Sequence, residues 1–393
     1  MRAFVVVEDG AEPAPSFAGD PRYEDLLAAE PAGFAFPELE ESDAASICYT
    51  SGTTGHPQGV VYSHRSVVLH AMGALMVDSH AVSADETVFP VTPMFHVNGW
   101  GLPYSTALAG AKLVLPGRDT DPDRLAALIE RERVTVSCAV PTVWARFADL
   151  LDAGRYDLSS LHRILIGGAS VSEGLIERYA AHGIEIRRGW GMTEMSPSGT
   201  MSRPATPTLE GAVVPGVELR ICDERGNELP WDGESVGEIE ARGPWVAAAY
   251  HEPEDDANTA RFHDGWLRTG DVGTIDAGGN LRLVDRTKDL VKSGGEWISS
   301  LELEALLLSH PGVLEAAVVA RPDPEWGERP VAFVVPGPGA SLTGEELAAF
   351  LRPHVAGWWV PDTFELLAEL PKTSVGKVDK RQLRVRTGGI VES

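Results

Sequence analysis

Residues 50–59 read Thr-Ser-Gly-Thr-Thr-Gly-His-Pro-Gln-Gly and lie between two short apolar stretches, 45–49 and 60–62. Small residues allow backbone N–H groups to converge on phosphate oxygens, and Ser and Thr hydroxyls add further donors. No Gly-Lys-Ser/Thr closes the run, so it is not a Walker-type loop. Alone, such a run is more typical of a surface turn, so phosphate binding is a hypothesis that other motifs must support.

Lysine usage gives the second indication of chemistry. Only six of the 33 basic residues are Lys, and five of these six lie at 288–292 and 372–380. The lysine ammonium is a compact charge on a flexible stem, suited to one phosphate or carboxylate oxygen. Chance clustering on a solvated surface is the alternative, and it is the weaker one for two such clusters together.

Composition limits the possible partners. The 393 residues carry 33 basic and 58 acidic side chains, a net charge of −25. This charge argues against nucleic acid and anionic membranes as general partners. No apolar run is long enough to span a bilayer, so we expect no integral membrane contact. Cys48, Cys138 and Cys222 are isolated, so we expect reduced thiols and a cytoplasmic protein.

The pattern of elements predicts an α/β fold. Residues 3–7 are expected to form a strand and 23–30 a helix, and from 59 to 187 strands alternate with helices, which predicts a largely parallel sheet. Short strands and Gly/Asp turns over 216–283 predict an antiparallel subdomain. A compact α+β unit follows. We place the domain boundary at the charged junction 285–289, giving a large domain, 1–287, and a small mobile domain, 288–393.

Five motifs in fixed order carry a resemblance to a known superfamily. They are the run 50–59, Gly-Trp-Gly-Met-Thr-Glu at 189–194, Gly-Trp-Leu-Arg-Thr-Gly-Asp at 265–271, the junction 286–292, and 371–377. This order resembles the adenylate-forming enzymes, which include acyl-CoA synthetases, nonribosomal-peptide adenylation domains and firefly luciferase. Residues 93–100 and 292–299 are most similar to bacterial medium- and long-chain fatty-acid–CoA ligases.

The resemblance implies a two-step reaction with ATP, Mg²⁺ and coenzyme A. A carboxylic acid, here a medium- or long-chain fatty acid, is joined to the α-phosphate of ATP with release of pyrophosphate. The thiol of coenzyme A then attacks the acyl-adenylate. Such an acid–thiol ligase acts mainly by positioning and charge neutralisation.

The resemblance also implies roles for individual residues. It assigns the nucleotide to Thr50, Ser51, Gly52, Thr53, Thr54, Gly55, Gly168, Gly189, Trp190, Gly191, Thr193, Asp271, Arg286, Lys288 and Lys292, and Mg²⁺ to Thr50 and Glu194. It assigns catalysis to Lys377, Glu194, His96 and Arg286, and the acyl and coenzyme A path to Val97, Trp100, Gly295 and Trp297. Lys377 would bridge the carboxylate and the α-phosphate. The small domain would then swing about Lys288.

Ordinary structural roles remain open for several of these residues. Asp271 could cap a turn, His96 could be a core histidine, and Glu194 could be an exposed loop acid. Trp100 and Trp297 could be simple packing residues.

Two departures from the family pattern bear on function. Gln58 stands where the family has Lys, which removes a charge facing polyphosphate and predicts weaker ATP binding. The chain also lacks a long N-terminal portion typical of the family, so we expect uncovered apolar surface and either a homo-oligomer or a separate N-terminal partner chain. The alternatives are an adenylating ligase with a carrier-protein thiol or an amine as acceptor, and an impaired remnant or split subunit.

Overall fold

The computed structural model describes residues 5–7, 20–50, 57–117, 120–168, 171–203, 210–251, 257–373 and 377–388. The chain forms two compact units, residues 1–41 and 42–393. In the first unit, Tyr23–Ala29 forms helix α1, as predicted. Val6 makes a single bridge to Arg22, and the neighbouring valines are 47% and 69% exposed. The prediction of a core strand is therefore wrong for residues 5–7.

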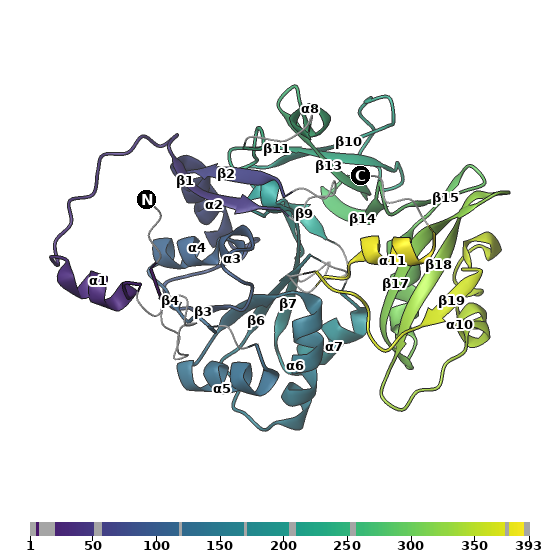
Figure 1. Cartoon of the computed structure of the whole chain (residues 1–393), viewed down its shortest axis with the longest axis horizontal. Coiled ribbons are helices and arrows are strands. Elements are labelled where there is room, and N and C mark those ends of the chain that lie inside the picture. Colours follow the sequence, from purple (N-terminus) through teal and green to yellow (C-terminus); the bar gives the residue numbers. More distant parts are fainter. Residues whose placement is uncertain are drawn as a thin grey trace. The chain divides into compact units, whose positions relative to one another are not determined.

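One long sheet organises the second unit (Figure 1). Among the described residues it has 12 strands in the order β10-β11-β13-β14-β9-β8-β7-β6-β5-β3-β4, with β12 on β13. Its parallel half contains β3 (Thr87–Pro90), β4 (Lys112–Leu113), β5 (Val136–Ala139), β6 (Arg163–Gly167) and β7 (Glu185–Trp190). This half confirms the predicted parallel sheet.

The parallel strands are apolar on both faces because both faces are covered. Ile164 and Ile166 pack with Trp144 on one face, and Leu165 packs with Leu102 on the other. Alternate side chains of a strand point to opposite faces, so this division follows from the pleat. The covering helices are α5 (Pro122–Glu132), α6 (Pro141–Ala153) and α7 (Glu173–Ala181) on the first face, and α2 (His64–Leu75), α3 (Val97–Trp100) and α4 (Leu102–Ala109) on the second.

The antiparallel strands predicted over 216–283 continue the same sheet. They are β10 (Glu218–Cys222), β11 (Gly237–Arg242), β12 (Phe262–His263), β13 (Trp266–Ile275) and β14 (Asn280–Arg286), with helix α8 (Ala257–Arg261) beside them. Two very short strands, β8 (Thr200–Met201) and β9 (Gly211–Val213), join the halves. A separate hairpin pairs β1 (Ala44–Tyr49) with β2 (Gly59–Ser63).

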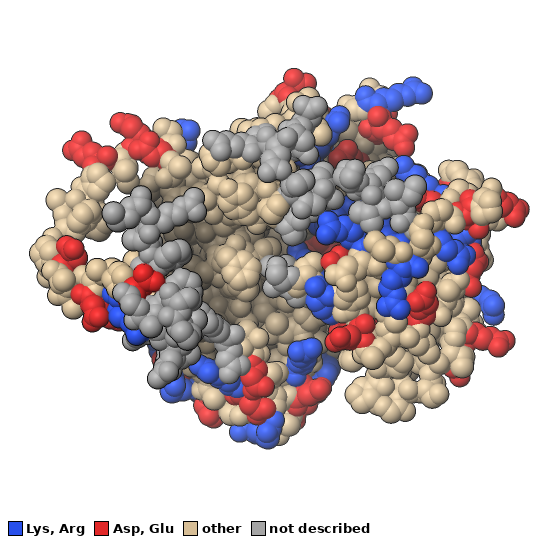
Figure 2. Space-filling view, viewed as in Figure 1, with Lys and Arg blue, Asp and Glu red and all other residues tan. Residues whose placement is uncertain are grey.

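The C-terminal part forms its own sheet of five strands among the described residues. Its elements are β15 (Val291–Ser293), β16 (Glu296–Ile298), α9 (Ser300–Ser309), β17 (Val313–Asp323), β18 (Gly327–Pro336), α10 (Gly344–Leu351), β19 (Thr363–Leu366) and α11 (Lys380–Arg386). Four of the seven residues of α11 are basic. Figure 2 shows Lys and Arg side chains gathered around this helix, against the acidic character of the whole chain.

Candidate active site

A buried aspartate joins the parallel and antiparallel halves of the long sheet. Asp271 lies on β13 and pairs in register with Arg286 on β14, whose Nε donates to Asp271 Oδ1 over 3.0 Å. The indole N–H of Trp190, at the end of β7, donates to Asp271 Oδ2 over 2.7 Å. Asp271 therefore acts within a strand and not as a turn cap. Its negative charge raises the pKa of the Arg286 guanidinium.

Lys377 lies against the backbone at the end of β6. A Cβ built on Gly168 would be 2.9 Å from Lys377 Cε and 3.0 Å from its Nζ. Burial, and after it the charge of Arg286, lower the pKa of Lys377 to about 8, although Asp271 opposes the shift. Lys377 is therefore still mostly protonated at neutral pH, and its ammonium lies beside Gly168 with the Asp271–Arg286 pair nearby.

Two hydrogen bonds between Lys377 and Thr373 help to position Lys377. The N–H of Thr373 donates to the Lys377 carbonyl over 2.7 Å, and the N–H of Lys377 donates to Thr373 Oγ1 over 3.2 Å. Two residues later, Asp379 Oδ1 accepts from the N–H groups of Arg381 and Gln382 and caps α11. Such a side-chain cap satisfies donors that the first helical turn leaves unpaired. Lys377 is thus held by its hydrogen bonds to Thr373 and lies just before a capped helix start.

His96 precedes a left-handed turn near Lys377. Val97, Asn98, Gly99, Trp100 and Gly101 have φ angles of 50°, 52°, 62°, 59° and 68°. This conformation costs roughly 1–2 kcal/mol for each residue with a Cβ, so the turn stores strain. Burial, and then the charge of Lys377, lower the pKa of His96 to about 4, so its imidazole is neutral at pH 7.

Contacts with other segments hold the strained turn in place. The Asn98 amide donates to Ser46 Oγ over 3.0 Å, and the Cys48 thiol donates to Asn98 Oδ1 over 3.4 Å. Trp100 is 9% exposed, and its ring lies 3.4 Å from where a Cβ on Gly167 would be. These contacts bring the turn against the end of β6, one residue before Gly168.

Glu194 is buried, so the reading of an exposed loop acid is wrong. It is 5% exposed, and the Tyr250 hydroxyl donates to its Oε1 over 2.5 Å. The Tyr62 hydroxyl donates to the neighbouring Thr193 carbonyl over 2.6 Å. Tyr62 and Tyr250 carry no motif, and their position beside Glu194 was not predicted.

The residues around Glu194 fit a Mg²⁺ ion bound mainly through phosphates. No cluster of three His, Cys, Asp or Glu side chains suited to a metal exists among the described residues. Mg²⁺ in nucleotide sites commonly takes one or two carboxylates, and substrate phosphates and water complete its coordination. A single buried carboxylate such as Glu194 matches that donor set.

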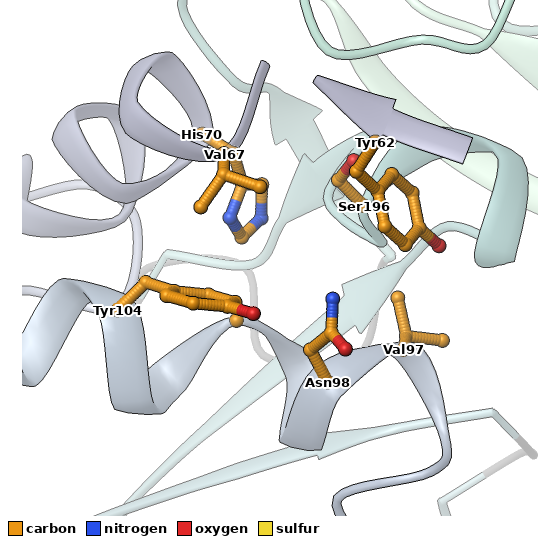
Figure 3. A pocket seen from close by; sticks show the side chains of 8 residues that line it. Tyr62, Val67, His70, Val97, Asn98, Tyr104 and Ser196 are labelled. Atoms are coloured by element: carbon orange, nitrogen blue, oxygen red, sulfur yellow. The ribbon is translucent and has the colours of Figure 1, made fainter. Parts of the chain in front are cut away.

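A small hollow lies beside the left-handed turn (Figure 3). Its free volume is only about 10 Å³, roughly the space of one water molecule, and it is lined by Tyr62, Val67, His70, Val97, Asn98, Gly101, Tyr104 and Ser196. His70 Nε2 lies 3.0 Å from Ser198 Oγ, and burial and then the nearby His80 lower the pKa of His70 to about 3. The hollow is thus walled by uncharged groups, partly apolar and partly hydrogen bonding.

Comparison with known proteins identifies the family. The model of the AMP-binding enzyme matches residues 5–251, and that of the AMP-binding enzyme C-terminal domain matches 302–377. The chain belongs to the AMP-binding enzyme family. It is 40% identical to a medium-chain-fatty-acid–CoA ligase of Ectopseudomonas oleovorans, over 100% of this chain and 74% of that protein. It is 44% identical to a long-chain-fatty-acid–CoA ligase of Thermus thermophilus, over 98% and 72%.

Solved structures of the AMP-binding enzymes have the same fold. ATP-bound MatB from Rhodopseudomonas palustris superposes with a TM-score of 0.85 at 27% identity, covering 99% of this chain and 80% of that one. The α/β fold class, with a small C-terminal domain, is thereby confirmed. The chain contains no helix, within the ranges described, that is long and apolar enough to cross a membrane.

Many of the predicted site residues of this AMP-binding enzyme lie close together. Gly189 pairs with Gly167 between β7 and β6, and Gly191 and Thr193 follow Trp190 directly. Ser51, Gly52, Thr53, Thr54 and Gly55 lie outside the described residues. Thr50 is described, and its N–H donates to the Gln58 carbonyl over 2.9 Å. Gln58 itself is 6% exposed.

The remaining predicted residues lie elsewhere in the AMP-binding enzyme. Lys288 lies between β14 and β15, and burial lowers its pKa. Lys292 pairs in register with Trp297 across the hairpin β15–β16, and Gly295 lies in its turn. Gly295 and Trp297 line a different hollow, with Val236, Leu290 and Trp359 among its other walls. In this conformation the hairpin is therefore not part of the site around Lys377.

Proposed function

We propose that this chain is an AMP-forming fatty-acid–CoA ligase in which Lys377 joins the acid to the α-phosphate of ATP. The observation that carries the proposal is the ammonium of Lys377 beside Gly168, with Asp271, Trp190 and Arg286 next to it. A protonated amine there would neutralise both the attacking carboxylate and the α-phosphate. Its alignment of two anions would supply much of the rate, since positioning and charge neutralisation dominate this chemistry.

The other residues would bind and orient the nucleotide. Asp271, oriented by Trp190 and Arg286, would accept hydrogen bonds from the ribose hydroxyls, and Gly168 and Gly189 would flank the adenine. Glu194 and Thr50 would hold Mg²⁺, which neutralises phosphate charge when bound. Residues 51–55, Gly191 and Thr193 would surround the phosphates. Lys288 and Lys292 would assist after the C-terminal domain, 288–393, swings about Lys288.

The acid would lie along the left-handed turn. Its carboxylate would approach His96 and Lys377, and its chain would pass Val97 and Trp100. The two relatives named for medium- and long-chain acids support a fatty acid as substrate. Gly295 and Trp297 would line the path of coenzyme A in the second step.

Location and assembly are part of the proposal. Cys48, Cys138 and Cys222 are free and buried thiols, which supports a reducing compartment such as the cytoplasm. We propose a homo-oligomer, which sedimentation of the purified chain would detect, or association with a separate N-terminal chain.

The test is pyrophosphate release by the purified chain with ATP, Mg²⁺ and acids from acetate to palmitate, with and without coenzyme A. We expect pyrophosphate release that depends on the acid and that Lys377→Ala reduces to a small residual rate. Acyl-CoA should form only with coenzyme A. Products formed without coenzyme A would favour a carrier-protein thiol or amine acceptor. A folded chain that binds ATP but releases no pyrophosphate with any acid would contradict the proposal.

A further inference from the structure

A buried ion pair anchors the start of helix α11, three residues after Lys377. Lys380 Nζ lies 2.7 Å from Glu304 Oε1 on α9 and also donates to Ser300 Oγ over 2.7 Å. Glu304 Oε1 accepts in addition from the N–H of Val318 on β17, over 2.7 Å. The side chains of Lys380 and Glu304 are only 15% and 11% exposed. One ammonium therefore ties α11 to α9, and its partner carboxylate ties α9 to β17.

The surrounding charges keep Lys380 protonated. Burial alone would lower the pKa of its ammonium, but Glu304, Asp289 and Asp285 together outweigh burial and raise it. Asp285 Oδ2 accepts from the N–H of Ser300, the same residue whose hydroxyl contacts Lys380. The carboxylates thus converge on Lys380 from the end of β14, from the loop after it and from α9.

A second cation holds α11 one turn further on. Arg384 forms an ion pair with Asp289 and donates to the Lys288 carbonyl over 3.1 Å. Lys380 and Arg384 are four residues apart and so lie on the same face of the helix. The face of α11 that carries them is therefore fixed to α9 and to the segment 285–289.

Backbone contacts connect this anchor to Lys377. The N–H of Asp379 donates to the Pro371 carbonyl over 2.8 Å, and Lys372 bridges Val378. Lys377 is therefore hydrogen-bonded to Thr373 and followed by the capped, anchored helix start. A displacement of the N-terminus of α11 would move the Lys377 backbone with it.

We propose that Lys380 is a positioning residue for Lys377, acting through its ion pair with Glu304. The inference rests on the proposed function, because Lys377 must do chemistry for its position to matter. Lys380 itself touches neither Gly168 nor the Asp271–Arg286 pair in the contacts found among the described residues. A purely structural ion pair is the alternative, and it predicts a change in stability without a specific effect on the Lys377 step.

The variants must separate these two roles. Removing Lys380 alone would leave Glu304 buried without its partner, which is strongly destabilising. The main variant is therefore Lys380→Met with Glu304→Gln, which removes both charges and keeps a carbonyl for the Val318 N–H. Lys380→Arg retains the cation. Arg386→Met is the matched control, since it removes an exposed pair with Glu365 of 3.9 Å at the far end of the same helix.

The measurement is acid-dependent exchange of pyrophosphate into ATP, with kcat and KM for ATP resolved, and Tm measured for each variant. We expect the double variant to lose roughly 10- to 100-fold in kcat, since a shift of about 1 Å in a catalytic group can have such an effect. Its KM for ATP should stay within about twofold of the wild-type value. The contacts that hold ATP equally in the ground state and the transition state are unchanged. Lys380→Arg restores most of kcat, and Arg386→Met behaves as wild type.

A double-mutant cycle gives the decisive comparison. In a Lys377→Ala background, followed at high enzyme concentration, the Lys380/Glu304 change should cause no further loss of the residual rate, because effects acting through one group are not additive. If the double variant does not fold, Ser300→Ala replaces it, with a smaller loss of kcat expected. A folded double variant with wild-type kcat, or an equal loss in both backgrounds, would overturn the proposal. Absence of exchange in the wild-type chain would refute the proposed function instead.

Discussion

The ammonium of Lys377 occupies the space that a side chain at Gly168 would need. A Cβ there would come within 2.9 Å of Lys377 Cε, and Gly168 has a φ of +83°, which L-residues rarely adopt. The absence of a side chain at residue 168 is therefore a condition for the position of Lys377. This relationship leads directly to a first test.

Gly168→Ala should lower kcat for pyrophosphate release by roughly tenfold, equivalent to about 1.4 kcal/mol, because Lys377 is displaced. The positive φ adds strain, so Tm falls as well. Gly174→Ala is the control, since Gly174 lies in α7 with open space around its Cβ position. Equal kcat values in the two variants would contradict the placement of Lys377.

The pH dependence of the first step should report the pKa of Lys377, about 8. The protonated form neutralises the reacting anions, so kcat/KM for ATP is high below this pKa and falls as pH rises through it. kcat/KM reports groups of the free enzyme. Exchange of pyrophosphate into ATP, without coenzyme A, avoids titration of the acceptor thiol.

Lys377→Arg provides the control for this profile. A guanidinium stays protonated throughout the accessible range, so the alkaline fall near pH 8 should disappear even though the maximal rate is lower. If the wild-type enzyme and Lys377→Arg show the same alkaline fall, the titrating group is not Lys377.

Trp190→Phe should weaken ATP binding and leave the aromatic packing largely intact. The variant removes the N–H that donates to Asp271 over 2.7 Å, and hydrogen bonds to charged groups contribute about 1.5–3 kcal/mol. The dissociation constant for ATP, measured by calorimetry, should rise by roughly 10- to 100-fold. Trp231→Phe, at a tryptophan that is 38% exposed, should leave it unchanged.

His70→Ala should shift the preferred acid toward longer chains. The imidazole forms one wall of a hollow that now has room for about one water molecule, and its removal would open space for an acyl chain beyond the left-handed turn. We expect the ratio of kcat/KM between long and short acids to rise by roughly tenfold, as expected for one methylene in an apolar pocket. Tyr104→Phe keeps the volume and should keep the preference. If His70→Ala shows the same preference as wild type among acids of increasing chain length, the acyl chain lies elsewhere.

Local patterns in the sequence predicted most of the elements from residue 59 onward. The helix expected from Asp121 begins at Pro122 with Asp121 as its cap, because the cap and the proline are both local signals. The strand expected over 315–320 extends instead over Val313–Asp323. At the C-terminal end, Arg321, Pro322 and Asp323 are held by pairing with β18, and not by apolar character of their own. The ends of this strand thus depend on the neighbouring strand in the sheet, which local sequence does not identify.

Site geometry could be predicted only where a motif signalled it. Trp190 and Asp271 are 81 residues apart, and nothing local shows that one donates to the other. Tyr250 reaches Glu194 across 56 residues from a segment without a motif. The left-handed conformation of Val97 and Trp100 was also beyond prediction, because these residue types avoid it and only tertiary contacts impose it.

The long sheet is narrowest between two groups of the residues proposed to bind the nucleotide. Strand β8 pairs with β7 and with β9 over two residues each. Gly168 and Trp190 lie on one side of this seam, and Asp271 and Arg286 lie on the other. A seam with few backbone hydrogen bonds is the most compliant part of a sheet. We therefore expect the sheet to bend most easily at β8. The Trp190–Asp271 hydrogen bond, which connects the two sides, should limit how far they move apart.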